Sequence, residues 1–272
     1  MKMKDKIDCL KEKHPFVLCI LISAVYLTAL KGTKWIVSFQ ITSNSYELKL
    51  IAECVGIIVS LIIMHLVGKK YILQEKGTGI LKGLFVGGFL VAICLLGVVS
   101  SLTNALHNEK ANQLLPLPQI VIFITTMAGV GISEEFIFRG TILNLLIDKF
   151  DKTPKGIYAS IIISSIIFGT AHITNIFSGV SVKSAFIQAV GATVLGALFG
   201  TIYLRTRNIW VVVILHALMD FSCLIGSGFF GINSITSEIN SYSYVKFIGF
   251  IIYLIPIVFL LRKEKLLEIL GD

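Results

Sequence analysis

Glu134, Glu135 and Arg139 are the ionisable residues whose spacing most directly suggests chemistry, because they lie inside an otherwise apolar stretch, GISEEFIFRG. On a helix, Glu135 and Arg139 are four residues apart and can form an ion pair. Glu134 is rotated by about 100° from Glu135 and can face a different neighbour. A carboxylate in such surroundings suits the role of a general base near neutral pH.

Two histidines and an aspartate extend this set. His172 ends the segment FGTAH, which begins at Phe168, and His216 precedes Asp220 by four residues in HALMD. At that spacing Asp220 can orient the imidazole of His216 or join it around a water or a metal ion. Taken singly, each motif fits a structural role equally well, as a buried ion pair or a hydrogen bond between helices. Together, at similar depth in the membrane, they predict metal-assisted or carboxylate-activated hydrolysis, in which a glutamate takes a proton and a second group stabilises the oxyanion.

The segments that must hold these residues are long apolar runs. The chain has 272 residues, of which 55% are hydrophobic and 15% charged, and its mean hydropathy is +0.86; this composition excludes a water-soluble globule. At about 20 apolar residues per crossing, the sequence predicts an all-α fold, a polytopic membrane helix bundle of about eight transmembrane helices. The expected spans are Phe16–Phe39, Leu50–Val67, Ile80–Leu102, Leu117–Ile147, Gly156–Val180, Ala185–Leu204, Ile209–Gly228 and Val245–Leu261.

Two further features of the spans carry expectations. Glu53 and His65 also fall in an apolar run, but each is near an end of its span, where we expect it to reach the membrane interface. Ala192, Gly196 and Gly200 repeat at every fourth residue, a stripe of small side chains that lets another helix approach closely. Helix packing is a sufficient explanation for this stripe.

Charge predicts the topology. Most Lys and Arg residues fall in alternate segments, 1–15, 69–76, 149–155, 205–207 and 262–265. Because cytoplasmic loops are enriched in Lys and Arg, we predict both termini to be cytosolic. We also predict a single integral membrane domain over residues 1–272, located in a bacterial plasma membrane. The net charge of +8 is assigned to topology and not to nucleic-acid binding. The five scattered cysteines are predicted to be free thiols.

The three motifs together resemble a known family, the CPBP or Abi group of intramembrane proteases, whose best-known branch is the CAAX prenyl endopeptidase. Residues Ser133–Arg139 match its EExxxR, Phe168–His172 match FxxxH, and His216–Asp220 match HxxxN/D, in the same order and spacing. The resemblance covers about 117–228, with the bacteriocin-processing branch as the expected relatives. The N-terminal spans, 16–102, carry no recognised signature and have no assigned role.

The resemblance also implies the roles of the site residues. The implied catalytic set is Glu134, Glu135, Arg139, His172, His216 and Asp220. Within it, Glu134 and His172 would activate water, His216 and Asp220 would stabilise the oxyanion, and the remaining two would hold the site together. Asp220 stands where the CAAX-processing branch has Asn, and an ionised Asp is a poorer oxyanion partner but a better metal ligand or histidine orienter. If a divalent metal such as zinc takes part, its candidate ligands are Glu134, His172, His216 and Asp220; no HExxH is present, and a purely glutamate-based mechanism is the alternative.

We therefore predict an intramembrane endopeptidase that hydrolyses a membrane-associated or lipid-modified peptide, with membrane lipid and that peptide as its partners. The main alternative is a non-catalytic membrane protein for bacteriocin self-immunity or a signalling scaffold. A serine protease with Ser133 as nucleophile is a weaker one, because the rhomboid GxSG would need Gly at position 134. An aspartyl protease is disfavoured because it needs two apposed aspartates. A proton-relay transporter is disfavoured because its sequence would show symmetric halves.

Overall fold

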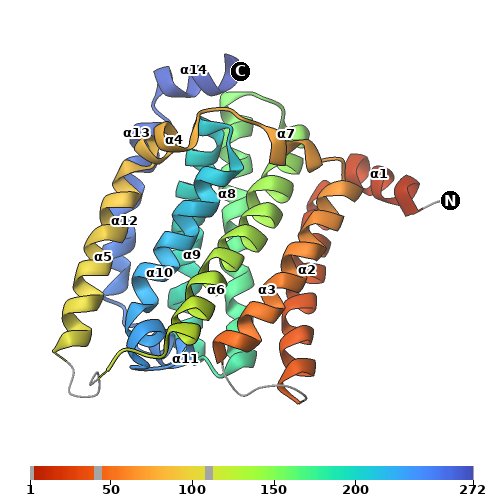
Figure 1. Ribbon diagram of the computed structural model, residues 1–272. Helices are drawn as coiled ribbons and strands as arrows, with labels where there is room; N and C mark the ends of the chain where they lie inside the picture. The colour runs from red at the N-terminus through yellow and green to blue at the C-terminus, as the bar shows by residue number, and fades with distance from the viewer. Residues whose placement is uncertain (1–2, 40–44, 108–112, 272) are drawn as a thin grey trace.

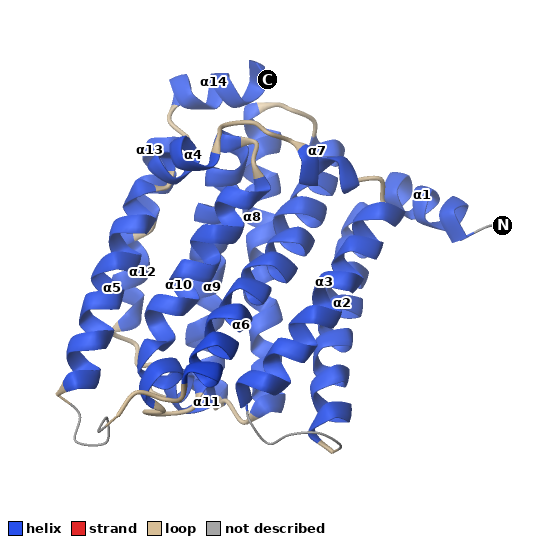
Figure 2. Cartoon of the chain, in the orientation of Figure 1, coloured by secondary structure: helices blue, strands red, loops and turns tan. Residues whose placement is uncertain are grey.

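The computed structural model describes residues 3–39, 45–107 and 113–271, and all regular structure in these ranges is helical (Figure 2). The predicted all-α class is therefore confirmed. The elements are α1 (Met3–Lys13), α2 (Pro15–Ser38), α3 (Ser45–Leu66), η1 (Lys70–Gln74), α4 (Ile80–Val86), α5 (Gly88–Leu106), α6 (Leu117–Glu135), η2 (Phe136–Leu143), α7 (Asn144–Phe150), α8 (Pro154–Ala171), η3 (His172–Ser178), α9 (Val182–Thr206), α10 (Ile209–Phe230), α11 (Ile235–Asn240), α12 (Lys246–Ile252), α13 (Leu254–Leu260) and α14 (Lys263–Gly271).

Seven of the expected spans are present as helices long and apolar enough to cross a membrane, among the residues that the structure describes. The chain is thus a multi-pass membrane protein. The helix with the central carboxylates is the longest, because α6, η2 and α7 continue one another over the 34 residues Leu117–Phe150. Several spans begin with a side-chain cap: Thr153 accepts a hydrogen bond from the amide of Gly156, and Asn208 from that of Trp210.

Two expected spans are interrupted. The third breaks at Gly87, so that α4 is a separate short helix and the crossing itself is Gly88–Leu106. The eighth is divided at Tyr253 into α12 and α13, and its apolar part, Lys246–Leu260, is too short to count with the seven. Pro256 explains this break, since proline has no amide hydrogen and its ring clashes with the carbonyl four residues earlier.

Both ends of the described chain lie at the same end of the bundle, which we call the terminal end; α4, α7 and α14 also lie there (Figure 1). After seven full crossings, α12 and α13 run in line back toward this end (Figure 1). The arrangement agrees with an even number of passes. That the terminal end faces the cytosol stays a prediction.

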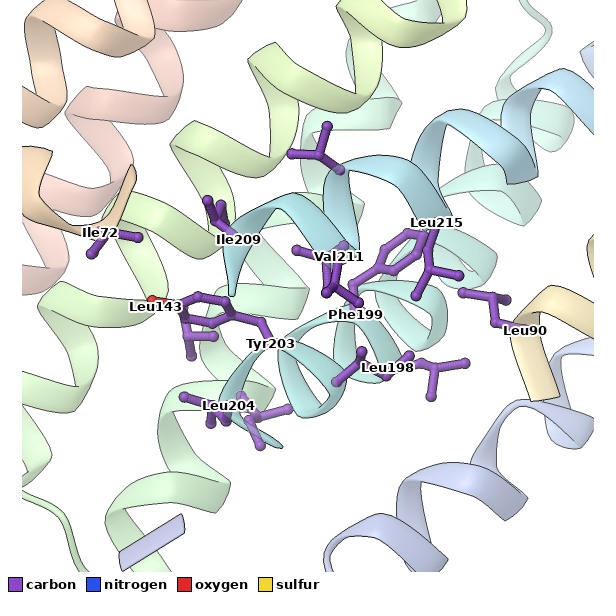
Figure 3. Packing of buried hydrophobic residues seen from close by; sticks show 14 of the residues in the cluster. Ile72, Leu90, Leu143, Leu198, Phe199, Tyr203, Leu204, Ile209, Val211 and Leu215 are labelled. Atoms are coloured by element: carbon purple, nitrogen blue, oxygen red, sulfur yellow. The ribbon is translucent and has the colours of Figure 1, made fainter. Parts of the chain in front are cut away.

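The core joins the helices that carry the three motifs. Phe199 and Tyr203 of α9 pack with Val211 and Leu215 of α10 and with Leu143 of η2, and all five are buried (Figure 3). Side chains of this size hold α9 and α10 firmly against the central helix. The rotation of α10 about its axis relative to the central helix is fixed as a result.

Glycine allows the motif helices to approach closely. A Cβ atom at Gly131 would lie 2.6 Å from the carbonyl oxygen of Val213 on α10, and one at Gly169 would lie 2.5 Å from that of Ala189 on α9. Real side chains do not tolerate such distances to backbone, so both positions require glycine. Gly131 brings α6 against α10 within one turn of Glu134.

Candidate active site

The long central helix changes its winding directly after Glu135. Residues Phe136–Leu143 form a π-helix, and all eight are buried. The hydroxyl of Thr141 donates to the carbonyl of Phe136 at 2.9 Å, and the side-chain amide of Asn144 donates to the carbonyl of Arg139 at 2.7 Å, in both cases five residues back. Wide turns of this kind occur frequently at functional sites.

Arg139, Glu135 and His216 form one buried relay. Nη1 of Arg139 donates to Oε1 of Glu135 at 2.6 Å, and Nδ1 of His216 lies 2.7 Å from the same oxygen. The three side chains are 3%, 0% and 6% exposed. The ion pair expected from the four-residue spacing is therefore present, and it also reaches across to α10.

Glu135, and not Asp220, orients the imidazole of His216. An ionised carboxylate only accepts hydrogen bonds, so Nδ1 of His216 carries a proton in this contact. The ring also stacks on Phe199, with centroids 5.0 Å apart and an interplanar angle of 20°. Asp220 is half-buried one turn farther along α10 and, among the described residues, makes no hydrogen bond to the imidazole. The second possibility offered by the four-residue spacing of these two residues, a shared water or metal, stays a prediction.

Glu134 faces the other nitrogen of the same imidazole. Its Oε2 atom lies 3.7 Å from Nε2 of His216, beyond hydrogen-bond length. This oxygen is buried and has no hydrogen-bond partner among the described residues, although the side chain as a whole is 18% exposed. A buried carboxylate oxygen without a partner is rare. The space between Glu134 and His216 is therefore the candidate position for a reacting group.

His172 begins η3, at the point where α8 ends. Its Nδ1 atom lies 3.0 Å from the carbonyl oxygen of Phe168, and because a carbonyl only accepts, Nδ1 carries the hydrogen. Nε2 of neutral His172 is then left as an acceptor. The ring centroid of Phe168 lies 4.9 Å from that of His172 and 6.0 Å from that of His216, and the guanidinium carbon of Arg139 lies 4.3 Å above it. Phe168 thus connects the three motifs by packing.

The glycine stripe of α9 also contacts this cluster. The carbonyl of Gly196 accepts a hydrogen bond from Nη2 of Arg139 at 3.2 Å, and a Cβ atom there would lie 2.9 Å from the ring of Phe168. The expected close packing is confirmed at Gly196. At Gly200 a Cβ would make only ordinary contacts, the nearest at 3.5 Å.

Glu53 is a buried carboxylate that was expected at the membrane interface, and that expectation is wrong. The residue is 2% exposed, and its Oε2 accepts a hydrogen bond of 2.6 Å from the hydroxyl of Ser133. The hydroxyl of Tyr26 lies 2.7 Å from the same serine oxygen and therefore donates to it. The physical reason is that α3 begins at Ser45, five residues before the expected Leu50, so Glu53 lies deeper. His65, at the other end of this helix, is exposed as expected.

This contact also bears on Ser133. The side chain is fully buried, and its proton is already donated to Glu53. A nucleophilic serine needs an accessible oxygen and an adjacent base. The geometry therefore disfavours the serine-protease alternative.

The N-terminal spans, which had no assigned role, enclose one side of the site. Lys34 of α2 and Lys49 of α3 are both within electrostatic range of Glu53 and Glu134. Nζ of Lys31 donates to the carbonyl of Thr174 at 2.8 Å and so connects α2 to η3, two residues after His172. These lysines offset the negative charge of the two carboxylates.

The candidate metal ligands do not assemble into a metal site. Within the described residues, no group of three or more His, Cys, Asp or Glu side chains is placed to hold an ion. The bonded nitrogen of each histidine is Nδ1, to Phe168 and to Glu135, and Nε2 of each ring is left, an arrangement that metal-ligating histidines also show. The role of a metal stays a prediction. The five cysteines are free thiols, as expected.

Comparison with known proteins agrees with the motifs. The model of the Rce1-like family, described as type II CAAX prenyl endopeptidase Rce1-like, matches residues 116–222. The protein named "Putative membrane peptidase YdiL" from Bacillus subtilis (strain 168) is 27% identical over 174 residues, which are 60% of this chain and 64% of the relative. The chain thus spans less than two thirds of that relative's length. No solved structure matches the chain. Both matches support the family predicted from the three motifs, the CPBP or Abi group; its bacteriocin-processing branch stays a prediction.

Proposed function

We propose that this chain, a CPBP-group membrane protein whose family match contains all three motifs, is an intramembrane endopeptidase. The observation that carries the proposal is the Glu134 carboxylate, which has a buried, unbonded oxygen 3.7 Å from Nε2 of an imidazole held by Glu135 and Arg139. The family description and the name of the Bacillus relative, a membrane peptidase, support the same class of reaction.

Charge balance indicates the starting state of the site. Glu135 and Arg139 neutralise each other at 2.6 Å. If Glu134 is ionised, an imidazolium at His216 makes the group of four neutral, whereas a neutral imidazole leaves the buried negative charge of Glu134 without a compensating charge inside the group. Because uncompensated buried charge is costly, we infer that His216 is protonated when Glu134 is ionised. Nε2 of His216 is then a hydrogen-bond donor.

Hydrolysis follows from these assignments. Glu134, helped by the acceptor nitrogen of His172, takes a proton from water as the water oxygen attacks the peptide carbonyl carbon. The carbonyl oxygen becomes an oxyanion, and Nε2–H of His216 donates to it. When the carbon–nitrogen bond breaks, the proton held by Glu134 passes to the leaving amine, and Glu134 is ionised again. Glu135 and Arg139 touch no reacting atom and act by positioning His216.

The substrate class follows from where this site lies. Glu134 is near the middle of the 34-residue span Leu117–Phe150, so a scissile bond must enter the bilayer to reach it. A peptide that is itself membrane-associated or carries a lipid meets this condition. We include prenylated tails in this class. Their cleavage needs a direct test, because this chain has Asp220 where the CAAX-processing branch has Asn.

The proposal is tested with purified protein in liposomes and a panel of quenched fluorescent peptides, prenylated and unprenylated. We expect cleavage by the wild type, its loss in His172→Ala, resistance to a serine-directed fluorophosphonate, and persistence after chelation of divalent metals. If cleavage stops on chelation and returns with zinc, the metal-free steps above are wrong. If a folded wild type cleaves no peptide of the panel, the immunity or scaffold role takes the place of the endopeptidase.

A further inference from the structure

A second site lies at the terminal end of the bundle, away from the residues assigned to catalysis. A cavity of about 410 Å³ is lined by residues from α4, α9 and α14, helices that meet at this end (Figure 1). Its apolar lining includes Leu204 and Ile269, which are buried to 2% and 6% exposure. None of the residues assigned to the active site lines it.

The polar lining of this cavity is mainly cationic. Lys82, Arg205 and Lys265 contribute three positive charges against one carboxylate, Glu268. Arg205 donates from Nη2 to Oε2 of Glu268 at 2.6 Å, and Lys265 donates to Oε1 at 2.7 Å, so this carboxylate is shared by two cations. Their hydrogen bonds hold the pKa of the Glu268 carboxyl at about 2. The cavity keeps an excess of two positive charges.

Donors are left over after these contacts. Lys82 is exposed and, within the described part of the chain, has no ion-pair partner. Nε of Arg205 is buried and has no hydrogen-bond partner among the described residues, while the side chain as a whole is 11% exposed. Lys265 has two further N–H groups beyond the one given to Glu268. Such a site favours a ligand with several acceptor oxygens and a negative charge, such as a phosphate.

The surroundings of the cavity are those of a membrane interface. Leu81 and Phe85 of α4 are 85% and 87% exposed, one turn apart on a helix that leads into the crossing helix α5. Leu267 of α14 is 57% exposed beside the same cavity. Apolar side chains of this kind enter the acyl region when the polar face of a short helix lies among lipid headgroups. The cavity therefore opens where a phosphate and acyl chains are found together.

We propose that this cavity binds the phosphate of an anionic lipid headgroup, with Lys82 and Lys265 as donors and Arg205 as a supporting charge. The predicted cytosolic orientation of the terminal end agrees with this ligand, because anionic lipids supply the negative surface potential of the cytoplasmic leaflet. A free phosphate offers the same oxygens but leaves the apolar flank formed by α4 and α14 without a partner.

The experiment measures binding of short-chain phosphatidylglycerol, short-chain phosphatidylcholine and inorganic phosphate to the purified full-length protein by native mass spectrometry. We compare the wild type with Lys82→Gln, Lys265→Gln and the matched control Lys152→Gln, an exposed lysine at the same end that does not line the cavity. Each cavity variant should weaken phosphatidylglycerol binding about fivefold. The control should leave it unchanged.

Each alternative outcome overturns the proposal. Equal binding of phosphatidylcholine would mean that binding does not depend on the net charge of the headgroup. Phosphatidylglycerol binding that survives both cavity variants, or falls equally in the control, would place the lipid elsewhere. Inorganic phosphate bound as tightly as the lipid would assign the site to a soluble phosphate. Lys82 is exposed, so its replacement should fold normally, and a monodisperse peak in gel filtration checks this.

Discussion

Replacing Glu135 with glutamine removes the negative charge that Arg139 and His216 share. Oε1 of Glu135 accepts from Nη1 of Arg139 at 2.6 Å and from Nδ1 of His216 at 2.7 Å. The other carboxylate oxygen is buried and has no hydrogen-bond partner among the described residues. An amide NH₂ placed there would have no acceptor, so glutamine is nearly isosteric but cannot satisfy the site.

The magnitude follows from these contacts. Two hydrogen bonds to a charged acceptor, worth about 1.5–3 kcal/mol each, become bonds to a neutral one, worth about 0.5–1.5 kcal/mol each. A buried, unbonded donor adds about 1–3 kcal/mol. We expect Glu135→Gln to lower the free energy of unfolding by about 3–5 kcal/mol, the cost typical of removing one member of a buried ion pair. Because the carboxylate fixes the tautomer and charge of His216, kcat should also fall by about 10³–10⁴-fold.

The assay is denaturant unfolding in detergent together with cleavage of the best peptide of the panel. Glu75→Gln is the matched control, because Glu75 pairs with Arg207 at 3.3 Å and both side chains are partly exposed, 22% and 28%. A pair of this kind is worth about 1 kcal/mol or less. If Glu135→Gln were as stable as the control and cleaved at the wild-type rate, the relay would be irrelevant to both folding and catalysis.

Three further predictions concern positions outside the relay. Gly131→Ala should lower the free energy of unfolding by about 1–3 kcal/mol and abolish cleavage, since its Cβ would lie 2.6 Å from a backbone oxygen of α10. Gly226→Ala is the control and should fold and cleave normally, because its Cβ would have nothing within 4 Å. Equal effects of the two substitutions would contradict the packing argument. Ser133→Ala should lower the free energy of unfolding by about 1–3 kcal/mol, because it leaves the buried Glu53 carboxylate unbonded, but the variant should still cleave the peptides. Loss of cleavage in a fully stable variant would instead support a nucleophilic serine. The pKa of Glu268, held at about 2, lies below its ordinary 4.5, so its contribution to the docking of α14 is complete above pH 4.5 and is lost as the pH falls toward 2. A fluorescent probe on α14 should report this change in the wild type and not in Glu268→Gln.

The sequence was informative about single helices. Four-residue spacing predicted the Glu135–Arg139 pair, because both residues belong to one helix and its period places them on one face. Hydropathy likewise located six of the seven crossing helices to within five residues of their observed ends, whereas the third begins at Gly88, eight residues after the expected Ile80. The interruption of the eighth could have been found at Pro256, whose effect on a helix is known from its chemistry.

Contacts between helices could not be predicted in the same way. The same spacing rule suggested that Asp220 orients His216, whereas Glu135 does so from another helix. The period of α10 does not specify how that helix is rotated against α6; Gly131 and the packing around Phe199 determine it. Glu53 was misplaced because α3 begins five residues earlier than its apolar run indicates, and the π-helix after Glu135 has no recognised sequence signal.

The central claim is that Glu134 activates water inside the membrane, and its most direct test is Glu134→Gln in liposomes. This variant removes the base and loses no hydrogen bond of Oε2 among the described residues, but its buried amide donor should lower the free energy of unfolding by about 1–3 kcal/mol, which leaves the protein folded. Cleavage of every peptide that the wild type hydrolyses should be lost. A stable Glu134→Gln protein that still cleaves those peptides at the wild-type rate would contradict the account.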